Sequence, residues 1–350
     1  MSLVRDTVRP APLRLRVGPA ALKLERRMAG VCLALALGAV ALALAALCIG
    51  TLPVTPLQAG RALIGEGPAA VRLVVTEWRA PRVAGALMVG AALGMAGALF
   101  QTLLRNPLGS PDIVGFDAGA FSGALLAMLA GAGPLAVAGA GFGGGLVAGL
   151  AVFLLAGAGR RLALILTGIA VGALFTALND WIILTARLDT ALAAASWRLG
   201  SLAGIERGRL VAAAALLLVL LPLGLACART LRALELGEER AASLGEARRP
   251  AWTRIALVGL ALTATATFLA GPIGFVALIA PQIARSLTRS AGLPLLASAL
   301  SGAVFLLASD VAGRLLFAPR TIPAGALTAA VGGVYFVALL WMRRTGGAMR

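Results

Sequence analysis

Apolar runs of about 20 residues follow one another along most of this chain and limit its possible folds more than any other feature. A helix of that length crosses the hydrocarbon core of a membrane, which is about 30 Å thick. Hydrophobic residues make up 60% of the 350 residues and charged residues only 13%, about half the share in a soluble domain. The sequence therefore predicts an all-α, polytopic membrane protein.

The apolar runs divide into about ten predicted transmembrane helices, which form one membrane domain over residues 29–342. The segment 255–288 is long for one span and short for two, and Gly271 and Pro272 interrupt it. A single span followed by a re-entrant segment is the alternative there. The predicted spans are 29–50, 83–104, 112–131, 134–158, 162–186, 209–228, 254–270, 273–289, 293–315 and 323–342.

The basic residues predict the orientation of these spans. With a cytoplasmic N-terminus, 21 of the 31 Arg and Lys residues fall on the cytoplasmic side and 10 on the outer side. Residues 1–28 and 343–350 are then cytoplasmic tails of a multi-pass protein of the cell inner (cytoplasmic) membrane. In this interpretation the net charge of +17 sets topology among membrane lipids, and we expect no nucleic-acid partner.

The residue types exclude several kinds of chemistry. The chain has no histidine, so it cannot form a histidine metal site or a histidine-based triad. Its one lysine, Lys23, is followed by Leu24 and does not form the Gly-Lys-Ser/Thr loop that holds the phosphates of ATP. We therefore expect no enzyme activity, no catalytic residue, no cofactor and no bound metal.

A polar turn, RNPLGSPD at 105–112, separates the second and third predicted spans. Asn106 lies in this turn, and Pro107 and Gly109 end the first helix and shape the turn. Ser110 suits a helix N-cap, Pro111 the first helical position and Asp112 the positive end of the helix dipole. A well-made cytoplasmic turn accounts for all of these residues.

Two arginines flank a proline at the outer end of the second span, in Arg79-Ala80-Pro81-Arg82. They suit either anchoring at lipid phosphates or docking of an acidic partner surface. Arg314 lies near the same face in the predicted topology. Asp310, four residues before it on the same helix, offers a local ion pair as the alternative.

The longest predicted cytoplasmic loop, 229–253, is amphipathic. Two leucines precede a charged helical turn, and a Leu-Gly pair ends it. The loop is either a solvated connection or a helix that docks on another subunit. If the loop docks on another subunit, the residues that we expect to form the contact are Leu234, Leu236, Gly237, Glu238, Glu239, Leu244 and Gly245.

Charged residues inside the predicted spans are few, and Asp117 and Asp180 are the main candidates. Each suits a hydrogen-bonded pair or a helix end near water as well as a functional site. A secondary transporter needs ion-binding groups near the midplane, so this scarcity disfavours that class.

Several segments resemble the FecCD/BtuC family of ABC importer permeases for iron siderophores and cobalamin. They are EWRAPRV at 77–83, RNPLGSPDIVGF at 105–116, GPIGFVALIAPQIAR at 271–285 and IPAGALT at 322–328. The resemblance extends from about residue 30 to 342. In the third segment Ala277 and Gln282 replace the glycine and histidine of the family pattern, and the missing histidine argues against a proton-linked role. Pro281 in this predicted helix frees a backbone carbonyl that neighbouring helices must satisfy.

The resemblance implies a BtuC-like subunit of ten helices that forms a two-fold dimer. A separate ABC ATPase subunit dimer would attach on the cytoplasmic side, where the loop 229–253 would couple to it. A periplasmic or surface siderophore-binding protein would dock outside on Arg79, Arg82 and Arg314. Asn106, Pro107, Ser110, Pro111, Gly271, Pro272 and Pro281 would shape the turns and the gate.

VVTEWRAPRV at 74–83 and NPLGSPDIVGFDAGAFSG at 106–123 most resemble the subunits that import ferric siderophores of the catecholate (enterobactin) type. That resemblance favours a heterodimer with a second permease subunit, and a homodimer is the alternative. A cobalamin or haem permease of the same family, or an ion-coupled secondary transporter, remains as an alternative function.

Overall fold

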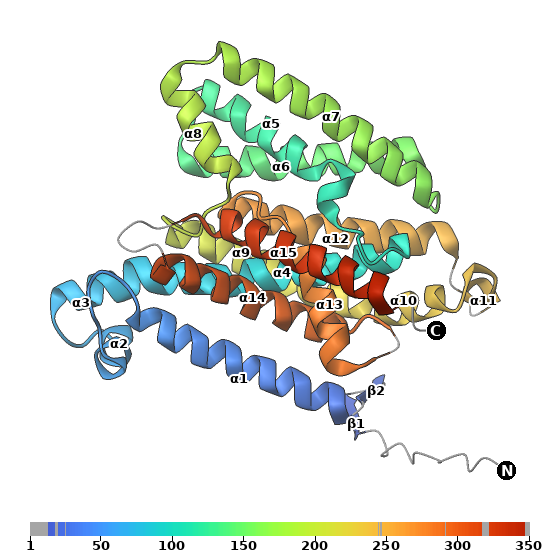
Figure 1. Ribbon diagram of the computed structural model, residues 1–350, viewed down its shortest axis with the longest axis horizontal. Helices are drawn as coiled ribbons and strands as arrows, with labels where there is room; N and C mark the ends of the chain where they lie inside the picture. Colours follow the sequence, from blue (N-terminus) through green and yellow to red (C-terminus); the bar gives the residue numbers. More distant parts are fainter. Residues whose placement is uncertain are drawn as a thin grey trace.

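The computed structural model describes residues 13–17, 20–24, 26–243, 245, 247–290, 292–316 and 322–346. Within these residues a helix lies in each of the ten predicted runs, which confirms the all-helical membrane fold class (Figure 1). Seven helical segments there are long and apolar enough to cross a membrane. They are α1 (Arg26–Cys48), α3 to α4 (Ala69–Leu104), α6 (Pro134–Ala156), α7 (Arg161–Thr185), α9 to α10 (Arg207–Glu235), α12 (Arg248–Ala270) and α14 (Leu295–Leu316).

Two other helices in the predicted runs are shorter, α5 (Phe116–Leu129) and α13 (Val276–Thr288). The last predicted run holds α15 (Ala324–Gly346), a helix of 23 residues. The start of α1 and the end of α15 lie toward the same end of the bundle (Figure 1). We call this the inner end, following the predicted topology, and the opposite end the outer end.

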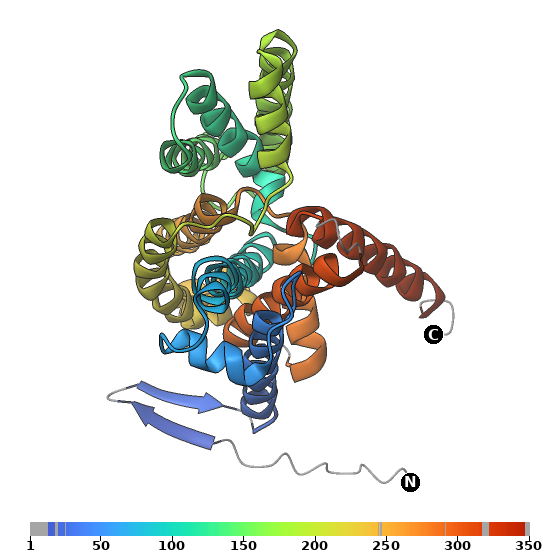
Figure 2. The ribbon, with the colours of Figure 1, turned by 90° about the vertical axis from the view of Figure 1, so that its left-hand side faces the viewer.

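Helix α4 (Ala80–Leu104) lies at the centre of the bundle, and most of its side chains are buried (Figure 2). Small residues allow α14 to approach it backbone to backbone. A Cβ atom added at Gly90 would collide with the carbonyl oxygen of Gly302, and one added at Gly94 with that of Ser298. Glycine at these positions therefore sets the spacing between the two helices.

Helices α5, α6, α7 and α8 (Leu188–Arg198) form a separate layer at one side of this centre (Figures 1 and 2). The α5 and α6 backbones come close where Gly123 faces the Ala140 carbonyl and Gly144 faces that of Gly119. The layer contacts the rest of the bundle through α6, whose Gly149 packs against Leu260 of α12. Glycines at 119, 123, 144 and 149 thus have the packing role expected of small residues between membrane helices.

The chain breaks between α12 and α13, as Gly271 and Pro272 predicted. Gly271 has a φ of 72°, and Phe275, just before α13, has a φ of 66°, which is uncommon for a residue with a side chain. Helix α13 has 13 residues, about 20 Å at 1.5 Å per residue, and is too short to cross a membrane alone. This favours a full span in α12 followed by a shorter segment.

The connections hold more structure than the sequence predicted. A two-stranded antiparallel hairpin, β1 (Leu13–Val17) and β2 (Ala20–Leu24), lies in the predicted N-terminal tail, so the described chain is not purely helical. The outer connection 51–79 holds α2 (Pro56–Leu63), α3 (Ala69–Leu73) and the π-helix η1 (Val74–Arg79). The inner connection holds α10 (Ala228–Glu235) and α11 (Glu238–Ser243).

Candidate functional site

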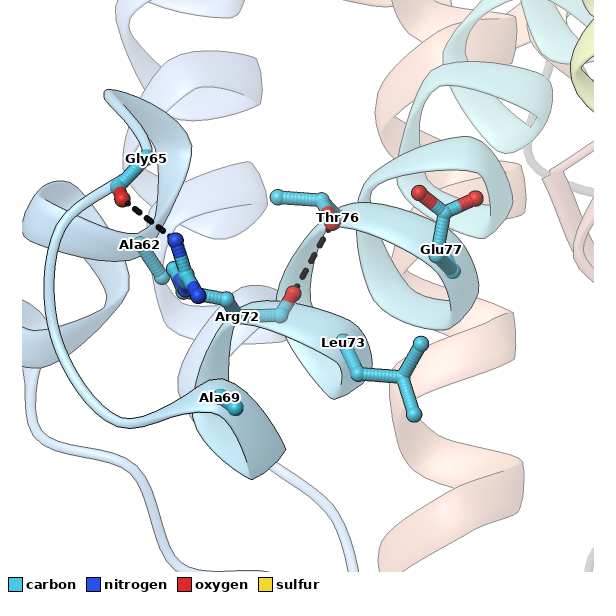
Figure 3. Close-up of a pocket in the computed structure, with 7 residues that line it drawn as sticks. All are labelled: Ala62, Gly65, Ala69, Arg72, Leu73, Thr76 and Glu77. Carbon is cyan, nitrogen blue, oxygen red and sulfur yellow. Dashed lines mark hydrogen bonds between the residues drawn. The ribbon is translucent and has the colours of Figure 1, made fainter.

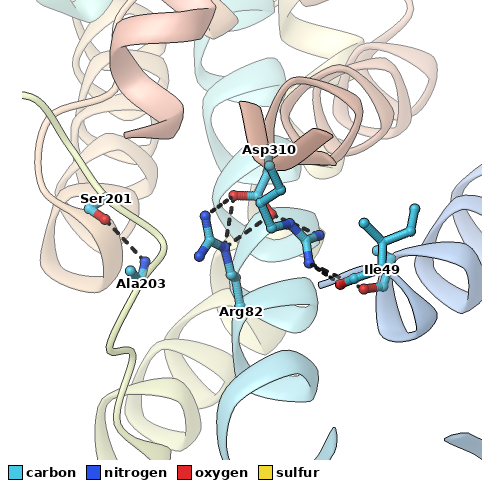
Figure 4. Close-up of polar contacts among 7 residues, drawn as sticks. Ile49, Arg82, Ser201, Ala203 and Asp310 are labelled. Atoms are coloured by element: carbon cyan, nitrogen blue, oxygen red, sulfur yellow. Dashed lines mark hydrogen bonds and ion pairs between the residues drawn. The ribbon is translucent and has the colours of Figure 1, made fainter. Parts of the chain in front are cut away.

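At the outer end, one buried carboxylate holds two arginines. Arg82 Nε lies 2.9 Å from Asp310 Oδ1 and 3.2 Å from Oδ2, and its terminal nitrogen lies 2.8 Å from Oδ1 (Figure 4). Arg314 lies 3.1 Å from the other carboxylate oxygen, which confirms the local pair expected from the four-residue spacing. The Asp310 side chain has no exposed surface, so both its charge and its hydrogen bonds depend on these arginines.

The same arginines hold the C-terminal end of α1. Arg79 donates to the carbonyls of Leu47 and Cys48 at 2.8 and 3.1 Å, and also to that of Leu52. Arg314 donates to the carbonyls of Ala46 and Ile49 at 3.2 and 3.3 Å. The last carbonyls of a helix lack partners within the helix and carry partial negative charge, so guanidinium groups suit this place.

We call Arg79, Arg82, Asp310 and Arg314 the outer arginine cluster. The cluster brings together the three arginines predicted for docking, but their exposure differs. Arg79 is 6% exposed, the Arg314 side chain 8% and the Arg82 side chain 16%. Arg82 therefore offers the most surface to an outside partner, while Arg79 and Arg314 are used mainly within the chain.

A small pocket of about 340 Å³ opens in the outer connection, between α2 and the α3 to η1 segment (Figure 3). Arg72 reaches across it and donates to the Gly65 carbonyl at 2.9 Å. Glu77 at its rim forms an ion pair of 2.6 Å with Arg207 of α9. The first contact joins α3 to the loop after α2, and the second joins η1 to the start of α9. Together they give the outer face a mixed charge.

At the inner end, the turn after α4 has the tight geometry that the sequence predicted, but the following helix begins later. The Asn106 side-chain oxygen accepts a hydrogen bond of 3.0 Å from the Leu108 amide, which closes a turn around Pro107. Ser110 and Pro111 begin only a short 3₁₀ helix, η2 (Pro111–Val114), and the Ser110 side chain caps no backbone amide there.

Gly115 then breaks the helix, with a φ of 73°, so α5 begins at Phe116 instead of residue 112. The expected capping of the third span at Ser110 is therefore wrong. The left-handed backbone of Gly115 is incompatible with a continuous helix from 112, and a close contact with α7 favours glycine there, since a Cβ at Gly115 would lie 3.0 Å from the Gly168 carbonyl oxygen.

The carboxyl group of Asp112, in η2, lies outside the spanning helices. Burial raises its pKa from 3.8 to about 6, while hydrogen bonds to backbone and to Ser110 act in the opposite direction. Asp180, the second candidate within a predicted span, is exposed and pairs with Arg198 at 3.4 Å. Asp180 thus has an ion-pair partner, and Asp117 lies in the first turn of α5.

The predicted coupling segment folds as two short helices with glycine joints. Leu231 and Leu234 of α10 are buried, and Leu236 is 56% exposed. Gly237 and Gly245, with φ of 110° and 84°, lie on either side of α11. The backbone of Glu238 and Glu239 begins α11, and Leu244 lies outside the described residues.

Two contacts join this coupling segment to the bundle. Arg105, at the end of α4, donates to the Leu234 carbonyl at 2.6 Å. Gly292, between α13 and α14, leaves room for the Glu235 carboxylate, since a Cβ there would lie 2.6 Å from it. The coupling segment thus touches both the turn after α4 and the turn after α13.

The structure also reveals a polar contact that the sequence analysis did not select. Gln101 of α4 is 3% exposed and bonds to Gln282 of α13 at 2.7 Å. The available signal was a glutamine within an otherwise apolar run, at a position where every neighbour is apolar or small. Gln101 and Gln282 lie close to Pro107 and Pro281, which the sequence analysis had selected as structural positions.

Comparison with known proteins agrees with this arrangement. A model of the FecCD transport family matches residues 37–342. The ferric enterobactin transport system permease protein FepG of Escherichia coli is 42% identical over 91% of this chain and 97% of its own length. The Fe(3+) dicitrate permease protein FecD of the same species is 37% identical over 76% of this chain and 85% of its own.

A solved structure is similar over most of the chain. It is a metal-chelate type ABC transporter in an inward-facing conformation, with a TM-score of 0.77 and 28% identity, covering 90% of this chain and 99% of the other.

Proposed function

This chain belongs to the FecCD transport family, and on that premise we propose that it is the permease subunit of an ABC importer that carries ferric siderophores of the catecholate class into the cell. The observation that carries the proposal is its end-to-end similarity to the ferric enterobactin permease. The chain is a transport subunit, and ATP hydrolysis takes place on a partner chain.

We infer that a siderophore-binding protein docks at the outer arginine cluster, with Arg82 as its main contact. An acidic group on the partner would approach Arg82 from the exposed side while Asp310 holds the guanidinium from within. Arg79 and Arg314 would support the site by fixing the end of α1 next to it.

On the inner side, the ABC ATPase subunit dimer would bind the coupling segment. The exposed Leu236 supplies an apolar contact, and the short helix α11 (Glu238–Ser243), which carries the exposed Arg240, follows it. Gly237 and Gly245 would let α11 change its angle as the ATPase subunits move. With both tails cytoplasmic, this surface faces the compartment that holds ATP.

We expect a second, different permease chain as the partner in the membrane, with a homodimer as the alternative. Co-expression of two differently tagged copies distinguishes the two arrangements. Capture of one tag with the other supports the homodimer, and its absence while the full transporter still assembles supports the heterodimer.

The experiment for the substrate is uptake of radioactive iron in cells that lack this chain but keep the other subunits. The chain supplied in trans should restore uptake of ferric enterobactin. Restored uptake of ferric citrate, haem or cobalamin without ferric enterobactin would reject the catecholate assignment and retain the importer. Uptake of none of these would reject the import function itself.

A further inference from the structure

We propose that Gln101 and Gln282 are positioning residues that transmit movement of the coupling segment to the broken segment between α12 and α13. The inference rests on the proposed function, since it concerns how ATPase movement reaches the gate. We call the two side chains the amide bridge.

Pro281 creates the need for one half of this bridge. A proline has no amide hydrogen, so within α13 the carbonyl of Ala277, four residues earlier, has no helical partner. Gln101 donates from α4 to the carbonyls of Leu278, at 3.0 Å, and Ala277, at 3.4 Å. The expectation that a neighbouring helix must satisfy the freed carbonyl is thus met by one buried side chain.

Gln282, the residue after that proline, forms the other half. Its nitrogen donates to Gln101 Oε1 at 2.7 Å and to the Pro107 carbonyl at 3.2 Å. Carbonyl oxygens only accept hydrogen bonds, so both glutamines must turn their nitrogen toward the backbone that they contact. The donor direction of the whole bridge is therefore fixed.

The bridge completes a continuous path from the inner surface. Leu234 of the coupling segment accepts from Arg105, which ends α4. Pro107 follows in the same turn and accepts from Gln282, while Gln101, one helical turn before Arg105, holds α13. A displacement of α10 therefore acts on the turn after α4 and, through the bridge, on α13.

The far end of that path is the part of the fold that can move. Phe275, with a left-handed backbone, immediately precedes α13, and residues 272–274 between it and Gly271 are not helical. The first turn of α13 packs on α4, where Gly97 leaves room for the Ala277 backbone. Because α13 is short and joined to α12 through this segment, the rest of it can tilt about that contact without breaking a long helix. The amide bridge fixes its angle relative to α4.

The test compares variants in the whole transporter reconstituted in liposomes, with its ATPase subunits and binding protein. Gln282→Glu keeps the size of the side chain but replaces its N–H donor with an acceptor oxygen. Gln282→Leu removes the donor and the acceptor together. We expect each to lower the amount of ferric siderophore transported per ATP hydrolysed by about fivefold or more, because ATPase movement would no longer reach α13. Gln282→His keeps a ring N–H donor, and we expect it to retain most of the coupling.

A matched control separates transmission from simple stability. Asn179 of α7 is another buried amide, and it bonds to Ser122 and to the Ala118 carbonyl of α5, within the separate layer formed by α5 to α8. Asn179→Leu should lower thermal stability and leave the transport-to-ATP ratio unchanged. An unchanged ratio in Gln282→Glu, or an equal fall in Asn179→Leu, would overturn the proposal.

Hydrogen exchange on the purified full-length chain tests the bridge even if the transport assignment fails. Gln282→Glu should speed amide exchange together in α13 and in the turn at 105–109, since both are held by the same side chain. Faster exchange in α13 alone would show that the two parts are not linked through Gln282.

Discussion

Asp310 of α14 and Arg82 of α4, 228 positions apart in the chain, meet in an ion pair in which the buried carboxylate receives Arg82 through two nitrogens. The pair joins the two central helices at their outer ends. The Arg82 side chain, 16% exposed, is also the most accessible member of the cluster. The same contact thus serves the stability of the bundle and, in our proposal, recognition of an outside partner.

Replacement of Asp310 should be far more costly than replacement of an exposed aspartate. Asp310→Asn leaves two guanidinium groups without their counter-ion, and removal of one partner from a buried pair typically costs about 3–5 kcal/mol. Asp180→Asn is the control, because its pair with Arg198 is exposed and worth about 0–1 kcal/mol. Thermal unfolding of the purified variants measures the difference, and equal losses would contradict the buried role of Asp310.

Arg82→Gln should weaken capture of the siderophore-binding protein by about tenfold, as expected for loss of about 1.4 kcal/mol at a charged contact. Binding to the transporter in nanodiscs measures the effect, and it should shrink at high salt. Arg160→Gln, an exposed arginine at the inner end, is the control. An unchanged affinity in Arg82→Gln would place the docking surface elsewhere on the outer face.

Leu236→Glu should prevent stable attachment of the ATPase subunits, because it places a charge on the exposed apolar contact of the coupling segment. Co-purification of the ATPase with the permease is the measurement. Leu63→Glu changes a similarly exposed leucine of α2 at the outer end and should leave attachment intact. Loss of the ATPase in both variants would indicate a general folding defect.

Gly115→Ala should destabilise the chain for two reasons, the left-handed backbone and the contact with α7. Gly131 has nearly the same φ, 70° against 73°, but nothing lies within 4 Å of the place where its Cβ would be. Gly131→Ala therefore bears only the backbone cost of about 1–2 kcal/mol. The additional loss of thermal stability in Gly115→Ala measures the α5 to α7 contact, and equal losses would show that this contact yields easily.

Asp112→Asn should stabilise the chain above pH 6 more than at pH 5. The pKa of Asp112 is raised from 3.8 to about 6, so the folded chain binds this proton more tightly than the unfolded chain. Stability then falls as the pH rises through this interval, and the amide escapes that fall because it does not ionise. Thermal unfolding of both proteins at pH 5 and pH 7.5 measures the stabilisation by Asp112→Asn. A smaller stabilisation at pH 7.5 than at pH 5 would contradict the prediction.

The spans could be predicted because the signal for a membrane helix lies within a short stretch of sequence. Each run of apolar residues carries its own transfer free energy, regardless of what it packs against. The turn at 105–109 was similarly local, since proline and asparagine constrain their own backbone.

The arginine contacts could not be predicted in the same way. The partners of Arg79 lie 27 to 32 positions away, and the carboxylate that holds Arg82 lies 228 away. From sequence alone a charged group near a helix end looks the same whether it faces lipid, water or a neighbouring helix. Gln101 was overlooked for this reason too, because its role depends on a carbonyl freed in another helix.

The contact between α4 and α14 has a mechanical consequence. Their backbones touch at Gly90, Gly94 and Gly302 with no side chain between them, so there are no rotamers whose rearrangement could absorb sliding or rotation. The two helices must move as one rigid beam through any cycle of opening and closing. The start of α13 meets this beam in the same way, since a Cβ at Gly97 would collide with the backbone of Ala277. Movement of α13 relative to the beam is therefore left to the part of α13 beyond that contact, which α4 holds through side chains.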